Sequence, residues 1–189
     1  MENFNPLLEG DLKLKQKFNQ DLAQFREKAY KAGNLMPKRY CLVLTNLCNL
    51  DCDFCYQLRT KQKNALNVED WINLIKQLPD NSRVTLTGGE PLVFNGFRNV
   101  FTEVILRHEC NLICNGLLLT EDLIDFLLSS KNFKVLSISI DNRGNTIRKQ
   151  ANIKEKKWEE KWEHTERMML YFQKRKIELG HERCGFLSS

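Results

Sequence analysis

The 189-residue chain lacks any apolar run of the roughly 18 residues that a membrane span needs. Its first residues alternate charged and apolar positions where a signal peptide would have an apolar block, so we expect a cytoplasmic protein without a membrane partner. Proline (4) and glycine (9) are scarce, which excludes collagen-like and linker-type chains. With 42% hydrophobic and 28% charged residues, the composition is that of a folded chain.

The chain also has little excess of either charge. Lys and Arg number 29 against 24 Asp and Glu, and the net charge of +5 is interleaved along the sequence, so nucleic acid is not an expected partner. The seven cysteines are an odd number in a chain without a secretory signal. A disulfide framework is therefore not expected, and metal binding and redox chemistry are the functions to consider for the cysteines.

Short apolar runs alternate with stretches of helical periodicity. The expected strands are 39–45, 83–87, 111–114 and 134–140, with a fifth opening at 183–187. The expected helices are 68–78, 97–108, 120–128 and 157–179, and Asn67 and Thr120 are candidate N-caps. The run at 39–45 is almost continuously apolar, as in a parallel strand buried on both faces. This alternation predicts a parallel α/β fold whose loops after the strands gather at one edge.

The N-terminal segment shows a helical pattern without an accompanying strand. Apolar positions recur at helical spacing over 11–31, and Gly33 and Pro37 then supply stop signals. We therefore expect an N-terminal helical leader over 1–36 that packs on the main body, followed by the α/β domain over 37–189.

Three cysteines follow the first expected strand within eight residues, at Cys48, Cys52 and Cys55. Such closely spaced thiolates suit an Fe–S cluster or zinc. A structural zinc site uses four protein ligands, whereas this segment has three cysteines and no nearby histidine. Three buried structural cysteines are a poor explanation because Asp51 and Asp53 lie between them.

The second expected strand ends in Gly88-Gly89-Glu90-Pro91. Paired glycines allow close backbone approach to a ligand and positive φ angles, and a carboxylate can receive an ammonium group. Taken alone, this motif is equally typical of a tight turn before a helix.

The order and spacing of the two motifs resemble the radical S-adenosylmethionine (radical SAM) superfamily. Cys48, Cys52 and Cys55 match its cysteine signature, with the aromatic Phe54 before the last cysteine. The Gly-Gly-Glu motif ends the second strand, as in the family. Cys114-Asn115-Gly116 resembles its Thr-Asn-Gly turn, and the segment from Ser137 to Asp141 resembles its fourth strand. Within the family, these motifs look most like the branch that matures ribosomal peptides and activates sulfatases.

The resemblance implies a partial TIM-like barrel with a 4Fe-4S cluster and SAM as cofactors. Cys48, Cys52 and Cys55 would ligate three irons, and SAM would bind the fourth. Gly88, Gly89 and Glu90 would hold the SAM amino group, with Glu90 as the charged partner. Phe54 would lie beside the adenine, Ser139 or Asp141 near the ribose, and Asn115 is a further cofactor-binding candidate. One-electron cleavage of SAM would then start hydrogen abstraction from a substrate, which the resemblance implies to be a peptide or protein, with a flavodoxin- or ferredoxin-type electron donor.

The length departs from the family pattern. At about 31 residues per strand–helix unit, the 153 residues from Pro37 onward hold four to five units, whereas the family core typically has six. We therefore expect a minimal or truncated member whose sheet is completed by a partner or a downstream segment. A non-catalytic Fe–S electron-transfer or regulatory module and a zinc-binding interaction domain remain as alternatives.

The other cysteines and the histidines point elsewhere. Cys41 and Cys110 are expected to pack in or beside strands, Cys114 stands near the predicted site, and Cys184 comes too late in the chain to judge. The three histidines are expected on the surface and without a catalytic partner.

Overall fold

The computed structural model divides the chain into two compact units, Met1–Pro37 and Lys38–Ser189. It describes residues 16–17, 20–21, 24, 27–28, 38–50, 52, 55, 66–139, 155–181 and 184–188, with the side chains of 155–158 and 187–188 left out. In the first unit, the described residues are helical and exposed. Most of the predicted helix over 11–31 lies outside the described residues, so its packing and the predicted boundary at residue 36 remain predictions.

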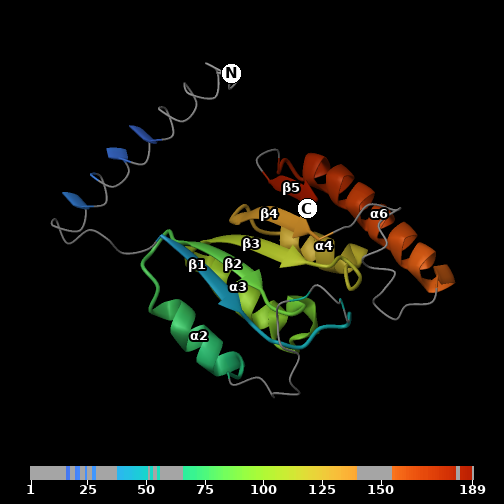
Figure 1. The fold of residues 1–189 in the computed structure, drawn as a ribbon, viewed down its shortest axis with the longest axis horizontal. Helices are drawn as coiled ribbons and strands as arrows, with labels where there is room; N and C mark the ends of the chain where they lie inside the picture. Colours follow the sequence, from blue (N-terminus) through green and yellow to red (C-terminus); the bar gives the residue numbers. More distant parts are fainter. Residues whose placement is uncertain are drawn as a thin grey trace, which may run out of the picture. The chain divides into compact units, whose positions relative to one another are not determined.

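The second unit alternates strands with helices, as predicted (Figure 1). The strands are β1 (Arg39–Val43), β2 (Arg83–Thr87), β3 (Glu109–Cys114), β4 (Phe133–Ile138) and β5 (Gly185–Ser188). The helices are α2 (Val68–Lys76), α3 (Phe97–Arg107), α4 (Glu121–Leu128) and α6 (Glu155–Glu178), and a short 3-10 helix, η1 (Pro91–Val93), was not predicted. Asn67 and Thr120 cap α2 and α4 through side-chain hydrogen bonds, as predicted. No helix in the described ranges is long and apolar enough to cross a membrane.

The five strands form one parallel sheet in the order β1-β2-β3-β4-β5. Leu42, Leu86, Leu112 and Leu136 lie in register across four of them. Sequential order without a reversal is the arrangement of a (βα) barrel, whereas a doubly wound sheet reverses direction at a switch point. The predicted fold class, a partial TIM-like barrel of four to five βα units, is confirmed.

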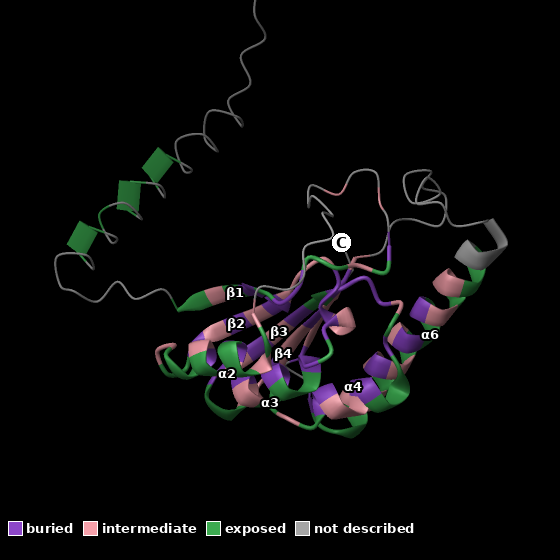
Figure 2. Cartoon of the chain, turned by 90° about the horizontal axis from the view of Figure 1, so that it is seen from below, coloured by how far each residue is buried: buried purple, intermediate pink, exposed green. Residues whose placement is uncertain are grey.

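The helices cover one face of the sheet (Figure 2). Right-handed crossovers between successive parallel strands place every helix on the same side. The leucine row points into this layer, and its members are at most 6% exposed. Phe101 and Phe172, from α3 and α6, are fully buried in the same core. This core fixes the ends of the strands, where the predicted site lies.

The opposite face of the sheet is partly open, which corrects the prediction for the first strand. Residues 39–43 alternate, so that Leu42 is buried while Cys41 and Val43 are exposed. Thr85 and Asn111 continue this face on the neighbouring strands and are half-buried. The expectation that the first strand is buried on both faces was therefore wrong, and so was the packing role expected for Cys41. The reason is that the helices cover only the other face.

Candidate functional site

The predicted site residues that the structure describes meet at the carboxyl edge of the sheet. A cavity of about 180 Å³ opens there. Its lining comes from the ends of strands and the loops that follow β1 to β4, and consists of Cys48, Leu50, Cys52, Cys55, Thr87, Gly88, Gly89, Ile113, Cys114, Asn115 and Ser139. Phe54 and Asp141 lie outside the described residues. Parallel strands place their carboxyl ends together, which explains how residues 91 positions apart share one cavity.

Gly88 and Gly89 bring the loop after β2 against the loop that carries the cysteines. The Gly89 N–H donates to the Thr45 carbonyl at 2.7 Å, and the Glu90 N–H donates to the Leu47 carbonyl at 2.8 Å. A Cβ on Gly88 would lie 2.5 Å from the Thr45 oxygen, and one on Gly89 would lie 2.8 Å from the Asn46 oxygen and closer still to that of Leu47. Neither glycine has a positive φ. The paired glycines are therefore required for close approach of two backbone segments, a role that residue types alone did not indicate.

The cysteine loop is arranged around its own polar groups. The Leu50 N–H donates to the Cys48 Sγ at 3.4 Å, and the Cys55 N–H donates to the Cys52 carbonyl at 3.0 Å, which closes a turn between the two later cysteines. Within the described ranges, no three Cys, His, Asp or Glu side chains converge as the ligands of a single ion would. In a cluster, each thiolate binds a different iron, so three cysteines spread around one cavity fit that group better than they fit zinc.

Glu90 is fully buried directly after the two glycines. Its Oε1 accepts the Leu92 N–H at 3.1 Å, and its Oε2 accepts the Asn115 N–H at 2.7 Å. Burial raises the pKa of this carboxyl from 4.5 to about 7, and the two backbone N–H groups act in the opposite direction. The carboxylate therefore joins the loops after β2 and β3.

This shift predicts a pH-dependent stability for the cofactor-free protein. Between pH 4.5 and about 7, the folded state keeps a proton on Glu90 that the unfolded chain releases, so the free energy of unfolding falls as the pH rises. The total loss should be about 3 kcal/mol, at 1.36 kcal/mol for each unit of pKa shift. Urea unfolding of the wild type and of Glu90→Gln, at pH 5 and pH 8, measures it. The difference in unfolding free energy between the two proteins should change with pH, and an equal difference at both values would contradict the assignment.

The cysteines outside the motif are buried thiols, apart from Cys41. Cys110 is fully buried, which confirms its packing role. Cys114 lines the cavity, and burial and the nearby Glu90 carboxylate raise the pKa of its thiol. Burial likewise raises the pKa of Cys184 to about 11.

Two histidines correct a sequence expectation. His108 and His181 are buried, at 1% and 5% exposure, where a surface position was predicted. His108 directly follows α3 and leads into β3, so the tight connection draws it into the interior.

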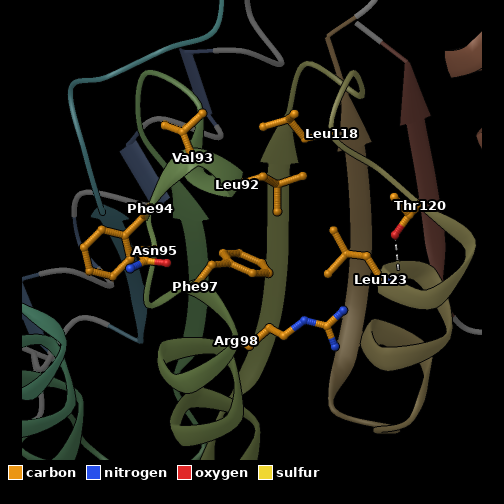
Figure 3. A pocket seen from close by; sticks show the side chains of 9 residues that line it. All are labelled: Leu92, Val93, Phe94, Asn95, Phe97, Arg98, Leu118, Thr120 and Leu123. Carbon is orange, nitrogen blue, oxygen red and sulfur yellow. Dashed lines mark hydrogen bonds between the residues drawn. The ribbon is translucent and has the colours of Figure 1, made fainter.

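A larger hollow of about 580 Å³ lies between η1, α3 and the segment leading into α4 (Figure 3). Its lining residues are Leu92, Val93, Phe94, Asn95, Phe97, Arg98, Leu118, Thr120 and Leu123. None of them is a cysteine, and Arg98 pairs with Asp122 and stacks on the Phe126 ring. The smaller cavity, which gathers the thiols and the two glycines, is therefore the candidate cofactor site.

Comparison with known proteins identifies the family of the chain. The model of the radical SAM superfamily matches residues 42–178. The sporulation killing factor maturation protein SkfB of Bacillus subtilis (strain 168) is 36% identical over 115 residues, which cover 59% of this chain and 28% of SkfB.

Solved structures share the fold. Streptococcus suis SuiB bound to the precursor peptide SuiA has a TM-score of 0.58 at 19% identity, covering 79% of this chain and 35% of SuiB. Native anSMEcpe with bound AdoMet and the Kp18Cys peptide has a TM-score of 0.58 at 18% identity, covering 79% of this chain and 42% of that protein. The chain thus spans less than half the length of each of these proteins. Because the family model covers most of the chain, including the cysteine motif and the Gly-Gly-Glu turn, the chain belongs to the radical SAM superfamily.

Proposed function

We propose that this protein is a radical SAM enzyme whose cofactors, a 4Fe-4S cluster and SAM, bind at the carboxyl edge of the sheet. One observation carries the proposal: Cys48, Cys52 and Cys55 line the same cavity as Gly88 and Gly89. Both cofactors are those of the family. The three thiolates would hold the cluster, and the backbone of the two glycines, which lines the cavity, would receive the amino end of SAM.

When bound, the cofactors would supply one-electron cleavage of SAM and, from it, hydrogen abstraction from a substrate. The chain's own residues bind, orient and exclude water. Ser139 lines the cavity and is held there by its N–H bond to the Cys114 carbonyl at 2.9 Å, which supports its predicted place near the ribose. The roles of Phe54 beside the adenine and of Asp141 near the ribose remain predictions.

The substrate that we propose is a peptide or protein. SkfB is a maturation protein, and the structures of SuiB and anSMEcpe include a precursor peptide and the Kp18Cys peptide. A flavodoxin- or ferredoxin-type protein would supply the electron. A partner or a further segment could complete the sheet beside β5.

Reductive SAM cleavage tests the proposal. After anaerobic reconstitution with iron and sulfide, the wild-type protein with a strong reductant should release 5′-deoxyadenosine and methionine from SAM. The Cys48→Ala/Cys52→Ala/Cys55→Ala variant, treated in the same way, should release neither above background. Release of both products from the triple variant would contradict the site. A stable cluster without SAM cleavage in the wild type would favour the electron-transfer or regulatory module.

A further inference from the structure

The residues that flank Cys48 are held by two different loops. On one side, the Leu47 carbonyl accepts the Glu90 N–H at 2.8 Å. On the other side, the Asn49 Oδ1 accepts the Asn115 Nδ2 at 2.7 Å. Cys48 is thus clamped between the loop after β2 and the loop after β3.

Asn115 also reaches the Cys48 sulfur. Its Nδ2 lies 3.9 Å from the Cys48 Sγ, which also accepts a hydrogen bond from the Leu50 N–H at 3.4 Å. The Asn115 Oδ1 accepts the Leu117 N–H at 3.0 Å, which fixes the direction in which the amide points. Asn115 is only 8% exposed, so this amide is directed by the protein and not by solvent.

Glu90 sets the position of Asn115. Its Oε2 accepts the Asn115 N–H at 2.7 Å, and its Oε1 is anchored by the Leu92 N–H. Gly88 and Gly89 line the cavity, whereas Glu90 is fully buried and is not among the described residues that do. Both carboxylate oxygens therefore already accept backbone N–H groups, one in the 3-10 helix that Glu90 caps and one in the loop after β3.

We infer that Glu90 and Asn115 form a clamp that positions Cys48 and directs an amide N–H at its sulfur, so that Glu90 is a positioning residue and not the direct partner of the SAM amino group. This inference rests on the proposed function, because it gives the Cys48 sulfur the role of an iron ligand. Hydrogen bonds to ligand sulfurs stabilise the reduced form of a cluster and raise its reduction potential. The clamp thus sets the potential of the cluster as well as its place.

The test compares near-isosteric variants of the anaerobically reconstituted full chain. Asn115→Asp keeps the backbone N–H and the Oδ1 acceptor but removes the Nδ2 donor. Glu90→Gln keeps the shape but places an NH₂ group against one of the two backbone N–H groups. Asn99→Asp, on the exposed side of α3, is the control for the same amide-to-carboxylate change away from the site. The measurements are iron content, the midpoint potential of the cluster from a titration followed by electron paramagnetic resonance, and the dissociation constant for SAM.

We expect all three variants to bind iron. The midpoint potential should shift to more negative values in Asn115→Asp, shift in the same direction by less in Glu90→Gln, and stay unchanged in Asn99→Asp. In the double variant Glu90→Gln/Asn115→Asp, the shift in midpoint potential should be no larger than in Asn115→Asp alone. The effects of two substitutions are not additive when both residues act through one chain of contacts. Should Asn115→Asp fail to fold, Asn115→Ala removes the same donor, retains the N–H bond to Glu90 and carries the same expectation.

Three results would overturn the inference. The first is an unchanged midpoint potential in Asn115→Asp, and the second is additive shifts in the double variant. The third is an unchanged potential in Glu90→Gln together with SAM binding weakened about tenfold or more, as the loss of a direct charge-assisted contact would cause. A wild-type protein that assembles no cluster would instead contradict the proposed function, so the two failures are distinguishable.

Discussion

Replacing any one of Cys48, Cys52 and Cys55 with alanine is expected to abolish the 4Fe-4S cluster. Each variant removes one of the three thiolates at the cavity, and two remaining thiolates cannot hold three of the irons. The change in bound iron should therefore be from about four atoms per chain to near zero. Iron and sulfide analysis with the absorption spectrum, after anaerobic reconstitution, measures it.

Cys41→Ala is the matched control. Cys41 lies on β1, only a few residues before the motif, and its side chain is exposed on the open face of the sheet. This variant should bind as much iron as the wild type. Full iron content in any of the three motif variants, or complete loss in Cys41→Ala, would show that the ligands have been assigned wrongly.

Gly89→Ala is expected to prevent cluster assembly without removing any thiolate. The new Cβ would collide with the carbonyl oxygens of Asn46 and Leu47, directly before Cys48, and backbone atoms cannot move aside as a flexible side chain can. Overpacking of this kind typically costs about 1–3 kcal/mol, and here the strain falls on the cysteine loop itself. Iron content should fall to a small fraction of the wild-type value, while circular dichroism should still report a folded chain.

Gly185→Ala controls for the loss of a glycine. A Cβ on Gly185, in β5, would lie at an ordinary contact distance of 3.5 Å from a Val135 methyl group, and Gly185 has no positive φ. This variant should fold and load iron normally. Equal iron content in Gly89→Ala and Gly185→Ala would mean that the two loops need not approach as closely as the structure shows.

Much of the fold could be read from the sequence because its signals are local. The strand at 83–87 was predicted to the residue, and Asn67 and Thr120 identified two helix starts by their capping chemistry. The cysteine motif was equally local, since three thiols within eight residues share one loop whatever the rest of the chain does.

The parts that could not be read depend on contacts between distant segments. A buried glutamate that joins two loops is indistinguishable in sequence from one that faces a ligand, so nothing indicated the bond between Glu90 and Asn115. Backbone oxygens such as those of Thr45 and Leu47 belong to every residue type and leave no compositional signal. The exposure of Cys41 required knowing which face of the sheet the helices cover.

The cavity has a consequence for how the domain unfolds. Its lining residues come from the carboxyl ends of β2 and β3 and from the loops after β1, β2, β3 and β4, so a ligand that fills it contacts four successive βα units. A molecule that binds only the folded state adds RT ln(1 + [L]/Kd) to stability, and here that gain is shared by units that could otherwise open separately. When the cofactors are bound, the βα units should therefore open together in one cooperative transition and not one by one. Hydrogen exchange in β1 to β4 should slow together on loading, by a common factor and not strand by strand.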